Sequence, residues 1–268
     1  MPETNRWTHP VRARLAGGLP VVAITIVTPN AEMAAWAATL GFHLLWVEME
    51  HSPITLESLR TFVLATRGLP AAVFARVPVN EFWTAKRVLD QGVSGVIFPF
   101  TSTVDLAARA VAGCRYPPAG RRGSGAGLAS ATWPAPGSYY DSADENVITV
   151  AVIEDREGLE NIDRIAATEG LDVIFIGTSD LSFSLGLRGA QDHPKLQDAI
   201  AKIAAAAKCN GKYLGRPAAT PEQVREYMTA GFLFFQAGTE LGMMTAGARA
   251  LLDPLGIGGI PASARSLY

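Results

Sequence analysis

The chain has 268 residues, of which 49% are hydrophobic and 18% are charged, and its formal net charge is −2 at pH 7. This length is enough for one large hydrophobic core, so the fold need not depend on disulfides or a structural metal. The near-neutral charge lacks the basic stripe that is typical of nucleic-acid-binding proteins. No apolar run approaches the roughly 20 residues that span a bilayer. We therefore expect neither a nucleic-acid partner nor a membrane partner.

The cysteines and the N-terminal segment indicate the compartment. Cys114 and Cys209 lie far apart and form neither a CxxC pair nor a zinc-ligand spacing. The first 18 residues are polar and lack the apolar stretch of a secretory signal, so we interpret them as a short arm before the first element. We expect a cytoplasmic protein with reduced thiols.

Short apolar runs alternate with helical patterns along the first half of the chain. Each helical pattern ends near a glycine, which is typical of a helix C-terminus. The predicted strands are 21–27, 44–48, 71–76 and 94–98, and the helices that follow them are 31–40, 56–66, 81–91 and 104–112.

The second half repeats this alternation. The predicted strands are 147–153, 173–176, 212–214 and 232–236, and the helices are 159–168, 195–209, 222–230 and 241–252. The strand runs are continuously apolar, as is typical of parallel strands that are buried on both faces. Eight β–α units favour an α/β fold of the (β/α)8 TIM barrel type, with residues 1–268 in a single domain. A doubly wound sheet would give the same alternation, but no GxGxxG follows the first strand.

One connection is unusually long. Residues 115–146 are rich in Gly, Pro, Ser and Tyr and separate the fourth helix from the fifth strand. The β–α alternation resumes after them, so they mark no domain boundary. A loop of this length in a compact domain is usually functional or disordered, and we expect this one, together with neighbouring subunits, to determine substrate choice.

Polar residues follow several of the predicted strands, and in a barrel the C-terminal ends of the strands surround one mouth. These residues are Glu48, Glu50, His51, Arg76, Glu154, Asp180 and Arg216. Glu154 and Asp180 each have a plain structural explanation, since carboxylates are favoured at helix N-termini. Together they are two hard oxygen ligands on adjacent strands, which is the minimal protein set for Mg²⁺ or Mn²⁺.

The other groups at this mouth also have two interpretations each. His51 is either a surface histidine or a general base. Arg76 ends a buried strand, so it either binds an anion or forms a structural pair with Glu48 or Glu50. The backbone N–H groups of residues 177–179 suit a carboxylate or phosphate. No lysine is placed for a Schiff base, because Lys86 lies within a helix and Lys212 begins a strand at the far end.

The sequence resembles the HpcH/HpaI aldolase family, which comprises class II pyruvate aldolases such as 4-hydroxy-2-oxoheptanedioate aldolase. The segments that carry the resemblance are WVEMEHSP, FARVP, VLDQGVSGVIFPF, YPPAGRRGSG, IEDREGLENIDRI and FIGTSDLSFSLG. They extend from residue 44 to residue 186 in the order of the family, and YPPAGRRGSG and FIGTSDLSFSLG are its most specific motifs. The resemblance implies a (β/α)8 barrel that assembles as a homohexamer, a trimer of dimers with exchanged C-terminal helices.

The resemblance also implies a metal-dependent aldehyde-lyase that acts on a small ketoacid and an aldehyde. Its cofactor would be Mg²⁺, Mn²⁺ or Co²⁺. The implied metal ligands are Glu154 and Asp180, the catalytic residues are His51 and Arg76, and Asp90 raises the basicity of the histidine from the same or a neighbouring subunit. The implied substrate-binding residues are Gly177, Thr178 and Ser179.

Two positions differ from the usual family pattern. Glu48 stands where the family often has Asp, three residues before the histidine. Val152 stands where it often has Gln, so an amide donor near the ketoacid is missing. Two alternative functions remain: an acyl-CoA lyase of the malyl-CoA or citramalyl-CoA type, and a non-catalytic barrel that binds ketoacids. The EHS context of His51 favours the free ketoacid over the thioester.

Overall fold

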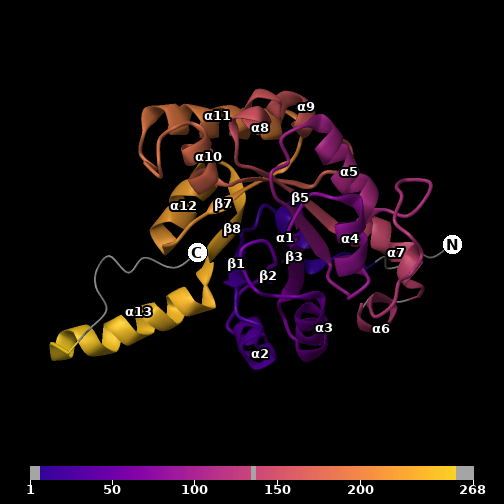
Figure 1. Ribbon diagram of the computed structural model, residues 1–268, viewed down its shortest axis with the longest axis horizontal. Helices are drawn as coiled ribbons and strands as arrows, with labels where there is room; N and C mark the ends of the chain where they lie inside the picture. Colours follow the sequence, from indigo (N-terminus) through magenta and orange to yellow (C-terminus); the bar gives the residue numbers. More distant parts are fainter. Residues whose placement is uncertain (1–6, 134–136, 258–268) are drawn as a thin grey trace.

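The computed structural model of the protein describes residues 7–133 and 137–257. The described residues form a closed parallel barrel in which the eight strands follow one another in chain order, and helices surround it (Figure 1). The predicted TIM barrel is therefore confirmed, and the doubly wound sheet is excluded. The assignment of residues 1–268 to one domain stays a prediction, because 1–6, 134–136 and 258–268 lie outside the described residues.

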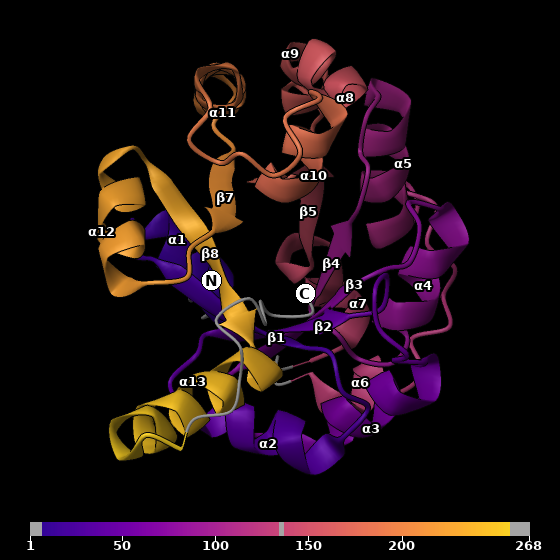
Figure 2. The same ribbon diagram turned by 60° about the vertical axis from the view of Figure 1, so that its left-hand side comes forward.

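The elements follow the predicted order with modest changes in their bounds. The strands are β1 (Val21–Ile26), β2 (Leu44–Glu48), β3 (Ala72–Arg76), β4 (Gly95–Phe98), β5 (Ile148–Ile153), β6 (Val173–Ile176), β7 (Tyr213–Pro217) and β8 (Phe232–Thr239). The predicted helices correspond to α2 (Ala31–Thr39), α3 (Leu56–Ala65), α4 (Phe82–Leu89), α5 (Val104–Cys114), α8 (Arg156–Glu160), α9 (Ile162–Ala166), α11 (Pro194–Cys209), α12 (Pro221–Thr229) and α13 (Glu240–Leu252). The view in Figure 2 shows how these helices surround the strands.

Several short helices were not predicted. They are α1 (Pro10–Ala16), α6 (Ala129–Thr132), α7 (Tyr139–Asn146), α10 (Thr178–Ser184) and the 3₁₀ turn η1 (Asp253–Leu255). The prediction of one continuous helix over 159–168 is wrong, because two short helices, α8 and α9, meet at Asn161. The Nδ2 of Asn161 donates to the carbonyl oxygen of Ser102 at 2.9 Å, so this amide is committed to a neighbouring loop.

The barrel interior is filled by aromatic side chains that require small neighbours. The rings of Trp46 and Phe175 lie 5.0 Å apart, and Phe234 contacts both within 6.5 Å. A Cβ on Gly215 would lie 2.7 Å from Phe175, so this strand position admits no larger side chain. This packing makes the interior a solid core, as in other barrels.

The end of the barrel at the N-termini of the strands is closed. Val11 and Leu15 of α1 pack beneath the interior, so residues 10–16 form a plug and not part of a polar arm. The long connection 115–146 lies at the same end, because it follows a helix and precedes a strand. Its centre is the fully buried guanidinium of Arg122, which lies over the rings of Tyr116 and Tyr139. Within one chain, therefore, the described residues of this loop lie away from the mouth, so the expectation that it determines substrate choice, that is, the choice of the aldehyde, is not supported there.

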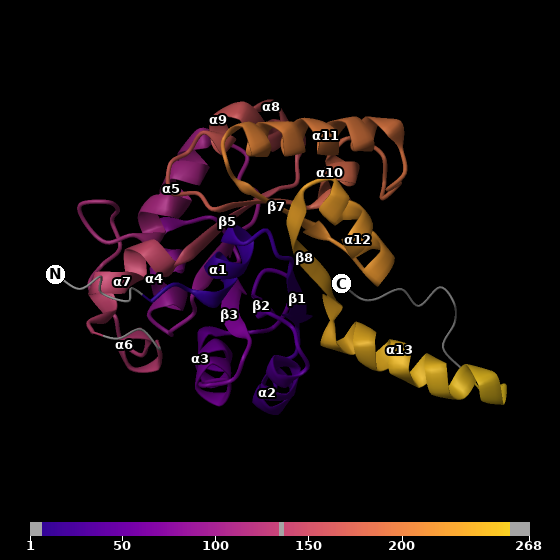
Figure 3. The same cartoon turned by 180° about the vertical axis from the view of Figure 1, so that it is seen from behind.

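The last helix leaves the barrel. Figures 1 and 3 show α13 extending away from the strands and the other helices. Glu240 is its one buried residue among those described, whereas Met244 and Leu251 are 62% and 67% exposed. None of the described helices combines the length and apolarity that crossing a bilayer requires.

Glu240 attaches the start of α13 to the barrel. Its carboxylate accepts the backbone N–H groups of Val27 and Thr28 at 2.9 and 2.8 Å, and the hydroxyl of Thr28 at 2.8 Å. These bonds join the end of β8 to the end of β1, where the barrel closes. Because the carboxylate is buried, it satisfies donors that would otherwise lack partners.

We therefore expect Glu240→Ala to lower the free energy of unfolding by about 2–3 kcal/mol, since it leaves buried N–H groups without an acceptor. The matched control is Glu222→Ala, in the exposed first turn of α12, which should leave the free energy of unfolding close to that of the wild type. Urea denaturation at equal protomer concentration measures both. Equal losses in the two variants would contradict this role.

Candidate active site

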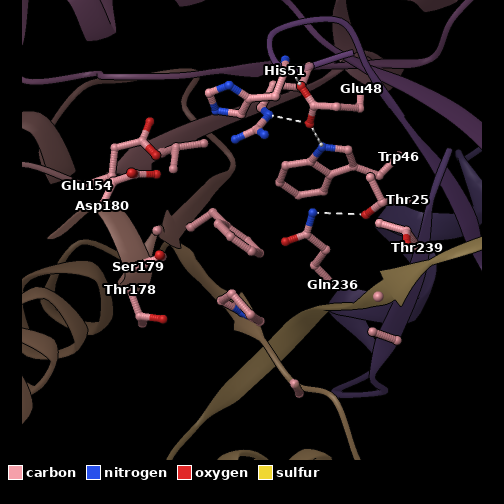
Figure 4. A pocket seen from close by; sticks show the side chains of 18 of the residues that line it. Thr25, Trp46, Glu48, His51, Glu154, Thr178, Ser179, Asp180, Gln236 and Thr239 are labelled. Atoms are coloured by element: carbon pink, nitrogen blue, oxygen red, sulfur yellow. Dashed lines mark hydrogen bonds and ion pairs between the residues drawn. The ribbon is translucent and has the colours of Figure 1, made fainter. Parts of the chain in front are cut away.

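A cavity of about 350 Å³ opens at the C-terminal ends of the strands. Its described lining comes from every strand except β4, or from the loops that follow those strands, and Figure 4 shows its labelled side chains converging on one space. Of the predicted site residues, the cavity is lined by Glu48, His51, Arg76, Val152, Glu154, Gly177, Thr178, Ser179 and Asp180. The barrel geometry therefore brings together residues that are distant in the sequence.

Glu48 and Arg76 form the most tightly bonded part of the site. They are register partners on β2 and β3, and Nε of Arg76 donates to Oε2 of Glu48 at 2.6 Å. The same carboxylate accepts the indole N–H of Trp46 at 3.3 Å, and its other oxygen accepts the backbone N–H groups of Glu50 and His51. Glu48 is 1% exposed and both of its oxygens are engaged. This geometry favours a positioning role for Glu48 over proton transfer.

Arg76 is held from two sides. Its Nη1 lies 3.1 Å from Oε2 of Glu50, in an ion pair without hydrogen-bond geometry. Nη2 has no partner among the described residues, so one edge of the guanidinium is left for a ligand in the cavity. The structural pair and the anion-binding role considered for Arg76 are therefore compatible.

His51 lies at the rim of the cavity with its side chain 50% exposed. Its Nε2 is 3.5 Å from Oε2 of Glu50, and its backbone is fixed by Glu48. Burial raises the pKa of Glu50, while Arg76 and His51 oppose that shift. A half-exposed imidazole beside a carboxylate can exchange protons with a bound ligand.

The carboxylates of Glu154 and Asp180 lie together on one side of the cavity (Figure 4). Glu154 follows β5 and is 2% exposed, and its Oε1 accepts the backbone N–H of Phe100 at 2.7 Å. Burial raises the pKa of Glu154 to about 7, and the charges of Glu50 and Asp180 add to this shift. Carboxylates held this close in a buried site repel one another unless a cation balances them.

These residues fit a divalent cation. The donor set is two carboxylates on adjacent strands, and hard oxygen ligands are those that Mg²⁺ and Mn²⁺ prefer. The described residues contain no group of three or more His, Cys, Asp and Glu side chains that could hold a metal ion. A site with two protein ligands leaves its other positions to water and substrate, which is typical of magnesium sites.

The segment after β6 contributes differently at each residue. The N–H of Gly177 donates to the carbonyl oxygen of Ile153 at 3.1 Å, so it is committed to the barrel. A Cβ at Gly177 would lie 2.7 Å from Oε2 of Glu154, and the glycine therefore allows this carboxylate its position. Thr178 and Ser179 begin α10, where backbone N–H groups precede the first helical acceptors. Those two residues, more than Gly177, can hold a substrate carboxylate.

Asp90 is not part of this cavity within one chain. It ends α4, at the opposite end of the barrel from the mouth, and accepts from Nη2 of Arg122 at 3.1 Å. Burial raises its pKa, and the hydrogen bond from Arg122 opposes that shift. The carboxylate that contacts His51 within this chain belongs to Glu50. An action of Asp90 on His51 therefore requires a neighbouring subunit.

Arg216 was expected at the mouth, and the structure places it elsewhere. It points outward from β7 and stacks on Tyr227, with its guanidinium carbon 3.7 Å from the ring centroid. Its neighbour Gly215 is the residue that faces the interior. Alternation along the strand explains the error, since adjacent residues face opposite sides.

Sequence reasoning missed one side of the cavity. Thr25, Trp46, Gln236 and Thr239 line it opposite the carboxylates (Figure 4), and we call them the acceptor wall. Phe175 also lines the cavity and packs against Trp46. Thr25 and Gln236 are polar residues within otherwise apolar runs. That pattern was a usable signal, because a polar side chain on a buried strand must find a partner.

Comparisons with known proteins point to one family. The family model described as HpcH/HpaI aldolase/citrate lyase matches residues 26–246. The 5-keto-4-deoxy-D-glucarate aldolase of Salmonella arizonae is 38% identical over 213 residues, which cover 80% of this chain and 83% of the relative.

Solved structures extend the likeness to the fold. An HpcH/HpaI aldolase/citrate lyase family protein from Burkholderia cenocepacia superposes with a TM-score of 0.86 at 31% identity, covering 92% of this chain and 99% of the other. The citrate synthase SbnG gives a TM-score of 0.82 at 27% identity, covering 91% and 96%.

The paired carboxylates predict that Mn²⁺ stabilises the folded protein. At a hundredfold excess over its dissociation constant, the ion should add about 2.7 kcal/mol, which calorimetry detects as a rise in Tm. Glu154→Gln should abolish this rise, because it removes one of the two charged ligands. Asp155→Asn is the matched control: Asp155 caps α8 at the next position, and asparagine preserves the cap. A full Mn²⁺-dependent rise in Glu154→Gln would rule out Glu154 as a ligand.

Proposed function

The chain belongs to the HpcH/HpaI aldolase/citrate lyase family, and from this membership we propose a divalent-metal-dependent pyruvate aldolase that forms and cleaves 4-hydroxy-2-oxo acids. The predicted enzyme class, an aldehyde-lyase, is confirmed at the level of the family. The observation that carries the proposal is the placement of Glu154 and Asp180 in one cavity with Arg76 and His51.

The reaction develops negative charge at a defined atom. Cleavage breaks the C3–C4 bond of the oxoacid, releases the aldehyde and leaves an enolate whose charge lies on the C2 oxygen. When bound by Glu154 and Asp180, a divalent cation supplies a Lewis acid for that charge. Arg76 presents Nη2 toward the cavity while Glu48 and Glu50 hold its other nitrogens. A donor fixed before the charge develops requires no reorganisation during the reaction.

His51 is assigned the proton transfer. In cleavage it takes the proton of the C4 hydroxyl, and in synthesis it returns that proton to the new alkoxide. Within the chain, Oε2 of Glu50 lies 3.5 Å from Nε2 of this imidazole. Asp90 of a neighbouring subunit is proposed to act on the same ring. The first N–H groups of α10, at Thr178 and Ser179, are proposed to hold the carboxylate of the oxoacid.

Val152 and Glu48 shape this site without removing a reacting group. Val152 is 1% exposed at the bottom of the cavity and presents an aliphatic surface where the family often has an amide. The longer side chain of Glu48 reaches Arg76, Trp46 and two backbone N–H groups at once. The proposed role of Val152 is steric contact with the oxoacid.

The assembly and the compartment are part of the proposal. We propose a homohexamer in which α13 packs on a neighbouring barrel, since its apolar residues are exposed in the single chain. A cytoplasmic location is supported by the two free cysteines, Cys114 and Cys209. Mg²⁺, Mn²⁺ and Co²⁺ all suit the donor set.

The direct test is retro-aldol cleavage of a 4-hydroxy-2-oxo acid, followed through release of pyruvate. Treatment with a chelator should abolish the activity, and Mg²⁺, Mn²⁺ or Co²⁺ should restore it. Full activity in the presence of the chelator would overturn the metal role. Cleavage of malyl-CoA without cleavage of the free acid would favour the acyl-CoA lyase. Ligand binding with neither cleavage nor exchange of pyruvate methyl protons into deuterated water would favour the non-catalytic barrel.

Arg76→Lys should lower the rate of pyruvate methyl proton exchange by about 10²–10³-fold, because lysine keeps the charge but loses the fork that Glu48 and Glu50 position. Mn²⁺ affinity should stay within about twofold, since Arg76 is not a ligand. Arg109→Lys, in the exposed pair with Glu81, is the control that should match the wild type. An unchanged exchange rate in Arg76→Lys would remove Arg76 from the mechanism.

A further inference from the structure

One hydrogen bond joins two residues of the acceptor wall. Nε2 of Gln236 donates to Oγ1 of Thr25 at 2.9 Å, across the seam where β8 meets β1. Thr25 is 2% exposed, and its register partner on β2 is Trp46, whose ring packs against Phe175. A polar pair at such a position is costly unless its remaining hydrogen-bonding capacity is used.

The backbone of β8 is irregular where Gln236 lies. Its register with β1 shifts between the pairs Ala23–Gln236 and Thr25–Thr239, so the chain bulges at residues 237–238. Gly238 has a φ of 140° within this bulge, a conformation that favours glycine. Bulges beside active sites commonly redirect a side chain, and here the bulge follows the residue that extends into the cavity (Figure 4).

Only part of the Gln236 amide is engaged. Its Nε2 is fixed by Thr25, and no described residue donates to its Oε1, which points into the cavity in Figure 4. With the amide turned over, an N–H would face the cavity in its place. A hydroxyl both donates and accepts, so it pairs with either orientation of the amide.

The acceptor wall carries no charge. Arg76 is the only lysine or arginine among the described residues that line the cavity. Its guanidinium carbon lies 5.8 Å from the ring centroid of Trp46, but its charge is already paired with Glu48 and Glu50. A carboxylate against Thr25, Gln236 and the aromatic rings would lose its hydration without gaining a counter-charge. The wall therefore disfavours an aldehyde with an acidic tail.

We infer that the acceptor aldehyde is uncharged and carries a hydroxyl group that Gln236 binds, with Thr25 as the positioning residue that fixes the amide. This inference rests on the proposed aldolase function and assigns its second substrate to the class of neutral hydroxyaldehydes. The oxoacid lies at the carboxylate side of the cavity, and the aldehyde hydroxyl lies at the acceptor wall.

The test compares three two-carbon aldehydes as partners of pyruvate: glycolaldehyde, acetaldehyde and glyoxylate. The carbon next to the aldehyde group carries a hydroxyl in glycolaldehyde, is a methyl group in acetaldehyde, and is the carboxylate carbon in glyoxylate. Gln236→Met keeps the length of the side chain and removes its hydrogen bonds. It should lower the ratio of kcat/KM for glycolaldehyde to kcat/KM for acetaldehyde by about fivefold to tenfold, the effect of one neutral hydrogen bond. Comparing ratios between variants cancels the intrinsic reactivity of each aldehyde.

Two further variants test the position and the charge. Thr25→Val should lower the ratio of kcat/KM for glycolaldehyde to kcat/KM for acetaldehyde, but less than Gln236→Met does. Thr25→Ser, which keeps the hydroxyl, should retain the wild-type ratio. Gln236→Lys should raise the ratio for glyoxylate over glycolaldehyde. Gln197→Leu, at an exposed position on α11, is the matched control and should keep the wild-type ratios.

Two results in Gln236→Met overturn the inference while the proposed function stands. One is a ratio of kcat/KM for glycolaldehyde to kcat/KM for acetaldehyde that equals the wild-type ratio. The other is a larger loss of kcat/KM for glyoxylate than for glycolaldehyde. In both cases wild-type protein still exchanges the methyl protons of pyruvate and cleaves 4-hydroxy-2-oxo acids. Wild-type protein that does neither overturns the proposed function, and this inference with it.

Discussion

Four carboxylates and one guanidinium share the mouth of the barrel, and this imbalance of charge governs the site. Glu48 is matched by Arg76 and by backbone donors, but Glu50, Glu154 and Asp180 exceed the positive charge available. Burial raises the pKa values of Glu50 and Glu154, and the neighbouring carboxylates add to that shift. A protein tolerates such a cluster in a buried place where a cation binds, and the rest of the cavity is arranged around that requirement.

The two ends of the barrel serve different purposes. At one end Val11 and Leu15 of α1 pack against the barrel interior, and the connection around the buried Arg122 forms a separate cluster. At the other end glycines at positions 177 and 238 let the backbone approach closely or bulge, so that side chains converge on a ligand. The departing α13 begins at Glu240, which bonds to the β1–α2 loop beside the cavity. In the proposed homohexamer, the packing of that helix would thereby be linked to the geometry of the mouth.

Much of this arrangement follows from the sequence. The β–α alternation predicts the barrel, and the rule that strand ends share one mouth brings Glu48, His51, Arg76, Glu154 and Asp180 together. The side of the strand that each side chain faces was harder to predict. Arg76 and Arg216 both lie near the C-terminal ends of strands, but Arg76 lines the cavity and Arg216 points outward. The bulges of β8 shift the register locally, so the contact between Gln236 and Thr25 could not be predicted from spacing. Asp90 shows a further limit, since its reach depends on neighbouring subunits that the sequence does not position.

The central claim is that Glu154 and Asp180 hold one divalent cation against a bound oxoacid. Anomalous diffraction from crystals grown with Mn²⁺ and pyruvate tests it most directly. The account predicts a single manganese peak between these two carboxylates, with the keto oxygen and a carboxylate oxygen of pyruvate completing its coordination. Pyruvate density in the cavity without a manganese peak, or a peak at other residues, would contradict it.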